Sequence, residues 1–124
     1  GQVENYFATA SDELCLVVQI ETVEGMKNLE AIAQTDGVDA VFIGPADLSA
    51  SMGFPGEPNH PEVLAAIKDI ITRMRANNMP AGLMCLDPVA AKAYLEMGAS
   101  FVAVGVDLVL LANAVSNLRG EFEG

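Results

Sequence analysis

Acidic side chains follow several apolar segments of this sequence at the point where each segment ends. Glu21 follows an apolar run that ends at Ile20, and Asp47 comes shortly after a run that ends at Ile43. Two carboxylates, completed by water and substrate oxygens, form the kind of site that Mg²⁺ or Mn²⁺ occupies. Alternatively, each carboxylate caps the following helix, whose positive end favours an anion. Spacing alone leaves both interpretations open.

Several other residues are of types that could take part in binding or catalysis, but structural roles explain them better. Asp87 and Asp107 also follow apolar runs, and for them we favour helix capping. The Gly44–Ala46 turn leaves backbone N–H groups open to an anionic ligand, although Gly-Pro is also an ordinary turn. His60, the only histidine, precedes Pro61 at an expected helix start, so we assign it a capping or surface role. No Ser-His-Asp or Cys-His arrangement is evident, and the glycines fit neither nucleotide-binding spacing.

The segments that position these residues alternate between strand and helix patterns. Apolar runs typical of buried parallel strands occupy residues 14–21, 40–43, 81–85 and 101–105, and we expect the first to be buried on both faces. Helical patterns follow, with apolar stripes at Met26, Leu29 and Ile32; at Val63, Leu64, Ile67, Ile71 and Met74; between Asp87 and Gly98; and at Leu111, Val115, Leu118 and Phe122. Four such units without hairpin signals predict an α/β fold with a parallel sheet. An open doubly wound fold and half of an eight-stranded barrel both satisfy this pattern.

Composition narrows the class of partner. The 124 residues suit one domain, and a net charge of −11 argues against nucleic acid or an anionic membrane surface. No apolar run approaches the roughly 20 residues of a membrane helix. Cys15 and Cys85 each lie in an apolar run, which predicts buried thiols in a reducing, cytoplasmic setting. We therefore expect a small molecule, a metal ion or another subunit as partner.

Several motifs together resemble one enzyme family across the whole chain. The chain is similar to the carboxy-terminal half of the metal-dependent (class II) pyruvate aldolases, of the 4-hydroxy-2-oxoheptanedioate and 2-keto-3-deoxy-L-rhamnonate aldolase type. The shared motifs are VVQIET, GVDAVFIGPADLSASMGFPG, HPEV and YLEMGASFVAVGVDLVLLANA. The resemblance implies a (β/α)₈ TIM barrel, of which residues 1–124 would form the carboxy-terminal half, with about four β/α units.

The resemblance also implies roles for individual residues. Glu21 and Asp47 match the ligands of a divalent ion (Mg²⁺, Mn²⁺ or Co²⁺), and the N–H groups of Ala46 and Asp47, in the turn that begins at Gly44, match the site for the pyruvate carboxylate. Gln19 matches a position that orients metal-bound water. Met84 matches an apolar position that lines the substrate pocket.

The implied reaction is reversible cleavage of a 4-hydroxy-2-oxo acid to pyruvate and an aldehyde, with the metal stabilising the pyruvate enolate. The family's water-activating histidine and its oxo-contacting arginine belong to the amino-terminal half, and no residue here matches them. We therefore expect no complete catalytic machinery in this chain and no activity from it alone. The family also packs its last helix across a subunit boundary, which implies a homo-oligomer.

Two alternatives stay open. The chain could be a non-catalytic metal-binding or assembly fragment, as the missing half and the apolar last helix suggest. A citryl- or malyl-thioester lyase of the same superfamily is the other alternative, but such an enzyme binds coenzyme A, and no evident basic cluster would hold its phosphates.

Overall fold

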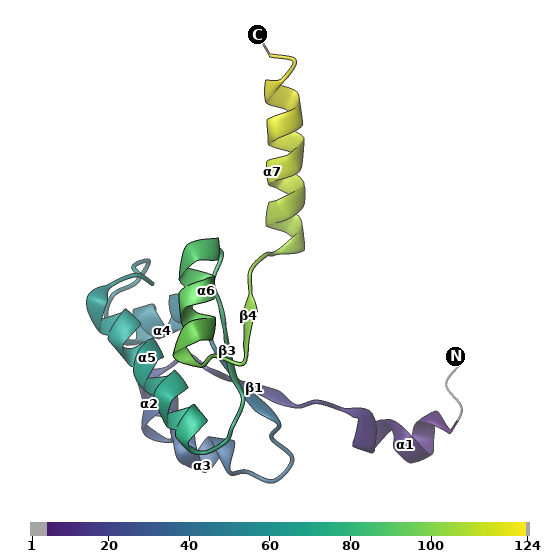
Figure 1. Cartoon of the computed structure of the whole chain (residues 1–124), viewed down its shortest axis with the longest axis vertical. Coiled ribbons are helices and arrows are strands. Elements are labelled where there is room, and N and C mark those ends of the chain that lie inside the picture. Colours follow the sequence, from purple (N-terminus) through teal and green to yellow (C-terminus); the bar gives the residue numbers. More distant parts are fainter. Residues whose placement is uncertain (1–4, 124) are drawn as a thin grey trace.

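The computed structural model describes residues 5–123, which contain a four-stranded parallel sheet with helices on one face (Figure 1). The strands lie side by side in chain order, and their bounds are β1 (Val17–Ile20), β2 (Ala40–Ile43), β3 (Ala81–Met84) and β4 (Phe101–Ala103). Parallel neighbours need a crossover connection, and helices supply each one. The predicted α/β class and the alternation of strands and helices are confirmed.

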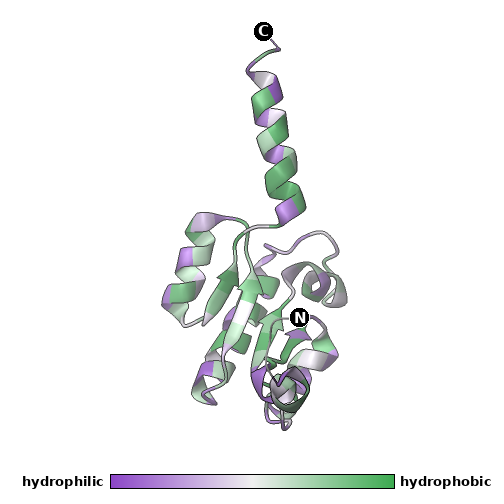
Figure 2. Ribbon diagram, turned by 90° about the vertical axis from the view of Figure 1, so that its right-hand side faces the viewer, coloured by the Kyte–Doolittle hydropathy of each residue, from purple (hydrophilic) through white to green (hydrophobic). Residues whose placement is uncertain are grey.

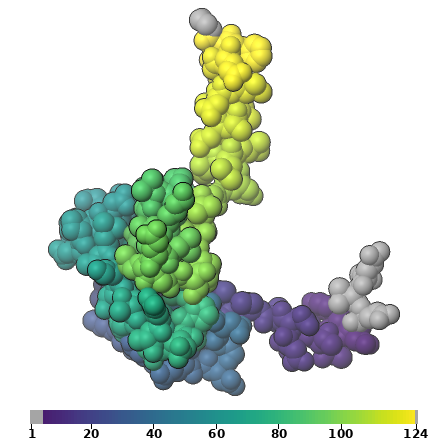
Figure 3. Space-filling view, in the orientation of Figure 1, coloured from purple at the N-terminus to yellow at the C-terminus, as the bar shows by residue number. Residues whose placement is uncertain are grey.

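Helices α2 to α6 cover one face of the sheet, whereas α1 and α7 extend away from it (Figure 3). The helix bounds are α1 (Tyr6–Glu13), α2 (Val23–Lys27), α3 (Leu29–Ala33), α4 (Pro45–Ser51), α5 (Pro61–Ala76), α6 (Pro88–Met97) and α7 (Asp107–Gly120). The single helix expected around residues 26–32 is two short helices, divided at Asn28. No helix in the described part of the chain is both long and apolar enough to cross a bilayer.

The core lies between the sheet and helix α5. The strands contribute the fully buried Ile20, Val41, Ile43 and Leu83, and α5 contributes Val63, Ile67, Ile70, Ile71 and Met74. These α5 residues recur at spacings of three and four, so they share one helix face. The predicted stripe is therefore correct except at Leu64, whose side chain is 38% exposed.

The opposite face of the sheet carries no helix and is apolar (Figure 2). On it, Phe42 of β2 stacks on Phe101 of β4, with ring centroids 6.0 Å apart. Gly82 of β3 lies between them in register, and a Cβ built on Gly82 would come within 2.3 Å of the Phe101 ring. Val17 on the same face is 40% exposed, so the expectation that β1 is buried on both faces is wrong.

Both cysteines are less buried than the sequence suggested. Cys15 is exposed in the segment between α1 and β1, Cys85 is half-buried, and both thiols are free. The apolar sequence neighbours of both cysteines predicted burial. Cys15, however, lies just before β1, which is an outer strand with no covering element at its edge in the described chain. The expectation of two buried cysteines is therefore wrong.

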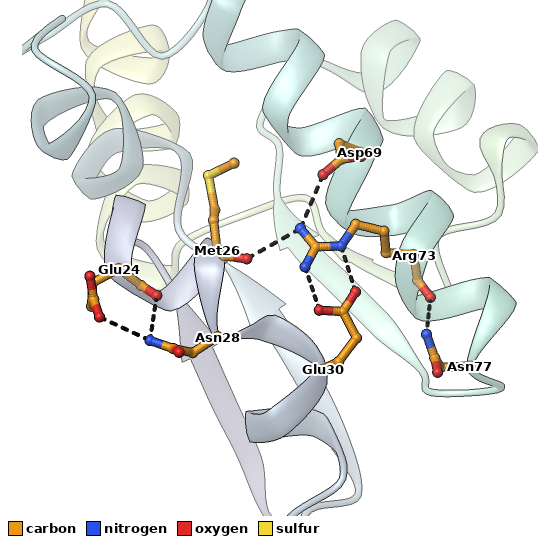
Figure 4. Close-up of polar contacts among 7 residues, drawn as sticks. All are labelled: Glu24, Met26, Asn28, Glu30, Asp69, Arg73 and Asn77. Atoms are coloured by element: carbon orange, nitrogen blue, oxygen red, sulfur yellow. Dashed lines mark hydrogen bonds and ion pairs between the residues drawn. The ribbon is translucent and has the colours of Figure 1, made fainter.

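An ion-pair cluster fastens α3 to α5 (Figure 4). The guanidinium of Arg73 donates from Nε and Nη2 to both carboxylate oxygens of Glu30, at 2.6 and 2.5 Å. Its Nη1 donates to Asp69 and to the carbonyl of Met26, each at 3.2 Å. The hydrogen bond from Arg73 lowers the pKa of Glu30, and the same bond raises the pKa of Arg73. A bidentate pair adds geometric specificity to the contact between the two helices.

Candidate functional site

The parallel register brings the first two strand ends to the same level. Ile20 pairs with Ile43, so Glu21 lies beside Gly44 at the carboxyl edge of the sheet. The amide of Gly44 donates to the carbonyl of Ile20 at 3.3 Å. In parallel α/β folds, ligands bind at this edge.

Glu21 is not a helix cap. The hydroxyl of Thr22 caps α2 by accepting from the Gly25 amide at 2.9 Å, so the capping alternative is wrong for Glu21. Instead, Gln19 Nε2 donates to Glu21 Oε2 at 3.1 Å. A Cβ built on Gly44 would lie 2.9 Å from that oxygen and 3.2 Å from the Cβ of Glu21. A side chain at position 44 would therefore press on Glu21, whose carboxylate and Cβ would both have to move away.

Asp47 lies in the first turn of α4, which begins immediately after Gly44. Its side chain is exposed and makes no capping hydrogen bond within residues 5–123, although as the acidic residue of the first turn it lies at the positive end of α4. The N–H groups of Ala46 and Asp47 also have no acceptor in this part of the chain, as first-turn amides commonly do not. A carboxylate and two amides at the start of α4 are therefore open toward solvent.

The residues assigned to structural roles behave largely as expected. Asp87 caps α6 by accepting from the Val89 amide at 3.0 Å. Asp107 is the first residue of α7 rather than its N-cap, and its carboxylate accepts from the next amide along the chain at 2.7 Å. His60 caps α5, with Nδ1 accepting from the Glu62 amide at 3.3 Å. Asp87 nevertheless lines the same hollow as Asp47, and its hydrogen bond to Val89 uses only one of its two carboxylate oxygens.

A hollow of about 960 Å³ opens beside these strand ends. It brings together five residues that the sequence assigned to the site, namely Gln19, Gly44, Ala46, Asp47 and Met84. Glu21 does not line the hollow but lies directly against two residues that do, Gln19 and Gly44. The structure thus assembles the predicted set in one place, with Glu21 at its border.

Sequence reasoning missed several residues of the hollow. Pro58 and Asn59 reach it from the loop before α5, and Leu64, Lys68 and Tyr94 reach it from α5 and α6. The loop is held by Phe54 and His60, whose rings stack with centroids 3.7 Å apart. One sequence signal could have identified this border of the site. The loop is long and rich in Gly and Pro, and it follows the helix that begins at the GPAD turn.

The pKa of one residue that lines the hollow is shifted from its ordinary value. Partial burial raises the pKa of the Tyr94 phenol, and the nearby Cys85 thiol adds a smaller effect in the same direction. A tyrosine is neutral around pH 7 even without this shift, and the lining helices present a mainly apolar wall to the hollow. Lys68 is the single cation among the lining residues.

The donor set fits a hard divalent ion that keeps much of its hydration. In residues 5–123 no group of three or more His, Cys, Asp and Glu side chains gathers closely enough to enclose a metal. Mg²⁺ characteristically takes only one or two protein carboxylates and completes its shell with water and substrate oxygens. Glu21 and Asp47 at adjacent strand ends, with the space kept by Gly44, match that requirement.

The known proteins that are similar to this chain include two aldolases. The chain is 52% identical over 124 residues to a hydroxypyruvate/pyruvate aldolase of Pseudomonas aeruginosa, covering 100% of this chain and 46% of that protein. It is 49% identical over 123 residues to a 2-keto-3-deoxy-L-rhamnonate aldolase of Klebsiella pneumoniae, covering 99% and 46%. The chain therefore spans about half the length of the curated relatives it matches.

Two solved structures of HpcH/HpaI family proteins also share the fold of this chain. A HpcH/HpaI aldolase/citrate lyase family protein from Burkholderia cenocepacia superposes with a TM-score of 0.86 at 33% identity, covering 98% of this chain and 47% of that one. A HpcH/HpaI aldolase from Desulfitobacterium hafniense superposes with a TM-score of 0.82 at 25% identity, covering 91% and 44%. The four strand–helix units thus correspond to half of a TIM-barrel chain. Because the family model matches residues 2–114, the chain belongs to the HpcH/HpaI aldolase/citrate lyase family.

Proposed function

We propose that this chain carries the metal- and pyruvate-binding half of a class II aldolase that cleaves a 4-hydroxy-2-oxo acid reversibly to pyruvate and an aldehyde. The observation that carries the proposal is the arrangement of Glu21 and Asp47. They follow adjacent parallel strands, neither side chain makes a capping hydrogen bond, and Gly44 keeps open the space beside the Glu21 carboxylate.

In this proposal Glu21 and Asp47 hold a divalent ion, and Gln19 fixes the orientation of Glu21 through its 3.1 Å hydrogen bond. The ion would act as a Lewis acid that stabilises the negative charge developing on the 2-oxo oxygen of the substrate. The N–H groups of Ala46 and Asp47 bind the substrate carboxylate, because they point out of a helix start and have no acceptor in the described chain. Met84 supplies an apolar wall that excludes water from the reacting carbons.

We further propose that residues 1–124 form the carboxy-terminal half of a single barrel domain. The proton-transfer histidine and the oxo-contacting arginine of the family have no counterpart in these residues, and His60 is already engaged as the cap of α5. The chain alone should therefore bind metal and pyruvate without turning over substrate. A thioester lyase is less well supported, since Lys68 is the single cation that lines the hollow.

The last helix supports a proposal about assembly. Leu111, Val115 and Leu118 of α7 are 58–64% exposed, although they form the apolar stripe seen in the sequence. We expect this stripe to pack against another subunit, because a large exposed apolar patch usually marks an interaction surface.

Binding of Mn²⁺ to the 124-residue chain tests the site directly. Electron paramagnetic resonance of free Mn²⁺ should show binding that Glu21→Gln and Asp47→Asn each weaken at least tenfold, about 1.4 kcal/mol. Pyruvate should tighten Mn²⁺ binding to the unmodified chain, since it adds oxygen ligands to the same ion.

Asp36→Asn is the matched control, because it removes one exposed carboxylate that lies before β2, at the other end of the sheet. Equal Mn²⁺ affinity in all four proteins would contradict the proposed site. For the reaction, a version with the rest of the barrel should release pyruvate from 4-hydroxy-2-oxo acids only with a divalent ion. Release that persists after chelation would contradict the mechanism.

A further inference from the structure

Asp87 is a carboxylate of the hollow that the proposed mechanism does not use. It follows the end of β3 and lines the hollow together with Met84. Because Leu83 pairs with Ile43, β3 ends at the level of the GPAD turn. The elements that build this part of the hollow, β2, α5, β3 and α6, pack against one another and lie away from the sheet edges (Figure 1). Asp87 therefore belongs to the same rim as the candidate ligands, one strand–helix unit further along the sheet.

Three local features hold Asp87 in position. Its Oδ1 accepts from the Val89 amide at 3.0 Å, and Pro88 restricts the backbone at the first position of α6. The thiol of Cys85 donates to the Asp87 carbonyl at 3.5 Å, across the turn between β3 and α6. Within residues 5–123 no donor bonds the second carboxylate oxygen, Oδ2. The chain therefore presents one carboxylate oxygen that is oriented by the backbone and has no partner in its described part.

Asp87 is set apart from the candidate metal ligands. Across residues 5–123 no three His, Cys, Asp or Glu side chains gather closely enough to hold one ion, so Asp87 does not join Glu21 and Asp47 around a metal. In the proposed function, α4 binds the carboxylate of the pyruvate part, and the reacting carbons lie against Met84. Asp87 comes after Met84 at the end of β3, where the part of the substrate that leaves as the aldehyde would extend.

The groups around Asp87 suit hydroxyl groups better than a second carboxylate or a hydrocarbon chain. Asn59 and Tyr94 bring a neutral amide and a neutral phenol to the same hollow. Hydroxyl groups donate strong, charge-assisted hydrogen bonds to a carboxylate. A hydrocarbon chain would remove water from Oδ2 without replacing its hydrogen bonds.

The position of Lys68 also argues against an acidic aldehyde. Lys68 is the single cation among the described residues that line the hollow. It lies about 10 Å along the axis of α5 from Pro61, the first residue, and α5 runs from the carboxyl edge of the sheet toward the opposite edge. An acidic aldehyde would therefore bring its charge close to the Asp87 carboxylate before it reached Lys68, and like charges repel.

We propose that Asp87 is a specificity-determining residue whose Oδ2 accepts hydrogen bonds from hydroxyl groups on the aldehyde part of the substrate. The substrate class is then a polyhydroxylated 4-hydroxy-2-oxo acid, rather than a dicarboxylic or an aliphatic one. This inference rests on the proposed function, because it requires the pyruvate part of the substrate to be held at Glu21 and Asp47.

Two acids of equal length test the proposal by calorimetric titration of the Mn²⁺-loaded 124-residue chain. 4,5,6-Trihydroxy-2-oxohexanoate carries two more hydroxyl groups than 4-hydroxy-2-oxohexanoate, and it should bind about tenfold more tightly or better. Asp87→Ser keeps one capping oxygen and removes the second, so this preference should disappear. The urea midpoint should stay close to that of the unmodified chain, because serine caps helices about as well as aspartate does. A lost preference then reports recognition and not folding.

Glu96→Gln is the matched control, since it removes an exposed carboxylate of α6 that does not line the hollow, and it should leave the preference unchanged. Titration with pyruvate separates the two possible failures. If pyruvate binds only with Mn²⁺ but neither hexanoate is preferred, this inference alone is overturned. A preference that Asp87→Ser retains, or tighter binding of 4-hydroxy-2-oxoheptanedioate than of the trihydroxy acid, has the same consequence. If pyruvate shows no Mn²⁺-dependent binding, the proposed function is overturned and this inference with it.

Discussion

Gly44→Ala isolates the contact on which the candidate site depends. The new Cβ would lie 2.9 Å from Glu21 Oε2 and 3.2 Å from the Cβ of Glu21. The carboxylate oxygen can rotate away from the methyl group. The Cβ of Glu21 is fixed by the backbone, so the two strand ends must also separate by a few tenths of an ångström. The substitution therefore changes the position of a metal ligand without removing any donor atom.

The expected size of the effect follows from these distances. Overpacking costs typically about 1–3 kcal/mol. Glu21 is only partly buried and its carboxylate can move, so we expect about 1 kcal/mol of lost stability, the low end of that range. For a chain of this size that is a fall in the unfolding temperature of roughly 3–6 °C. Displacement of one of two protein ligands should raise the Mn²⁺ dissociation constant about tenfold or more.

The assay is Mn²⁺ titration by calorimetry, with thermal unfolding measured on the same samples. Gly120→Ala is the matched control, since a Cβ at that helical position meets nothing within 4 Å. The Glu21→Gln background adds a second control. Because the ligand is already impaired there, Gly44→Ala should have little further effect on metal binding. Unchanged Mn²⁺ affinity in Gly44→Ala, or an equal loss in both backgrounds, would refute the reasoning.

Contacts elsewhere give three further expectations. Glu30→Gln should destabilise the chain near pH 7, as a lower urea midpoint would show. Arg73 lowers the pKa of Glu30 in the folded chain below its ordinary value of 4.5. The difference in urea midpoint between the two proteins should therefore shrink as the pH falls below 4.5, because protonation of Glu30 removes the stability that its ion pair with Arg73 contributes. Asp87→Ala should lower the free energy of unfolding by about 1 kcal/mol in urea titrations, through loss of the α6 cap. Gly82→Ala should displace the Phe101 ring, remove about 0.5–1.5 kcal/mol of aromatic stacking and change the near-ultraviolet circular dichroism.

Each of these expectations has a control or a contrary outcome. Glu62→Gln removes a carboxyl that makes no ion pair within residues 5–123, so it should not reproduce the pH dependence of Glu30→Gln. Asp87→Asn keeps an oxygen acceptor and should restore most of the stability lost in the alanine variant. An unaltered near-ultraviolet spectrum in Gly82→Ala would contradict the stacked arrangement of the rings.

Local sequence patterns were sufficient for the order of the elements and for the pair of candidate ligands. Buried parallel strands read as short apolar runs, and α5 reads as a stripe at helical spacing. Consecutive strands that are joined by helices become parallel neighbours, so their carboxyl ends meet at one edge. That rule placed Glu21 near the turn that contains Asp47. The caps at His60 and Asp87 were equally local, since a cap bonds an amide two residues away.

Other features depend on contacts between residues far apart in the chain. Only the structure showed that Thr22 rather than Glu21 caps α2, and that the Glu21 side chain lies against Gly44. The wall of the hollow from α5 and α6 also comes from packing between helices, which periodicity does not report. Sequence reasoning could identify the donors but not which of them were already occupied.

The sequence by itself determined which segments are apolar, the strand–helix order and the identity of the candidate ligands, because these depend on residue type and spacing. Tertiary structure alone decided which apolar surfaces are covered. The first strand and α7 have the pattern of buried elements, yet Val17 is 40% exposed and Leu111 is 64% exposed. An apolar residue favours burial wherever it occurs, but burial also requires a partner surface. For α7 and for the face of β1 that carries Val17, no element in the described part of the chain supplies one.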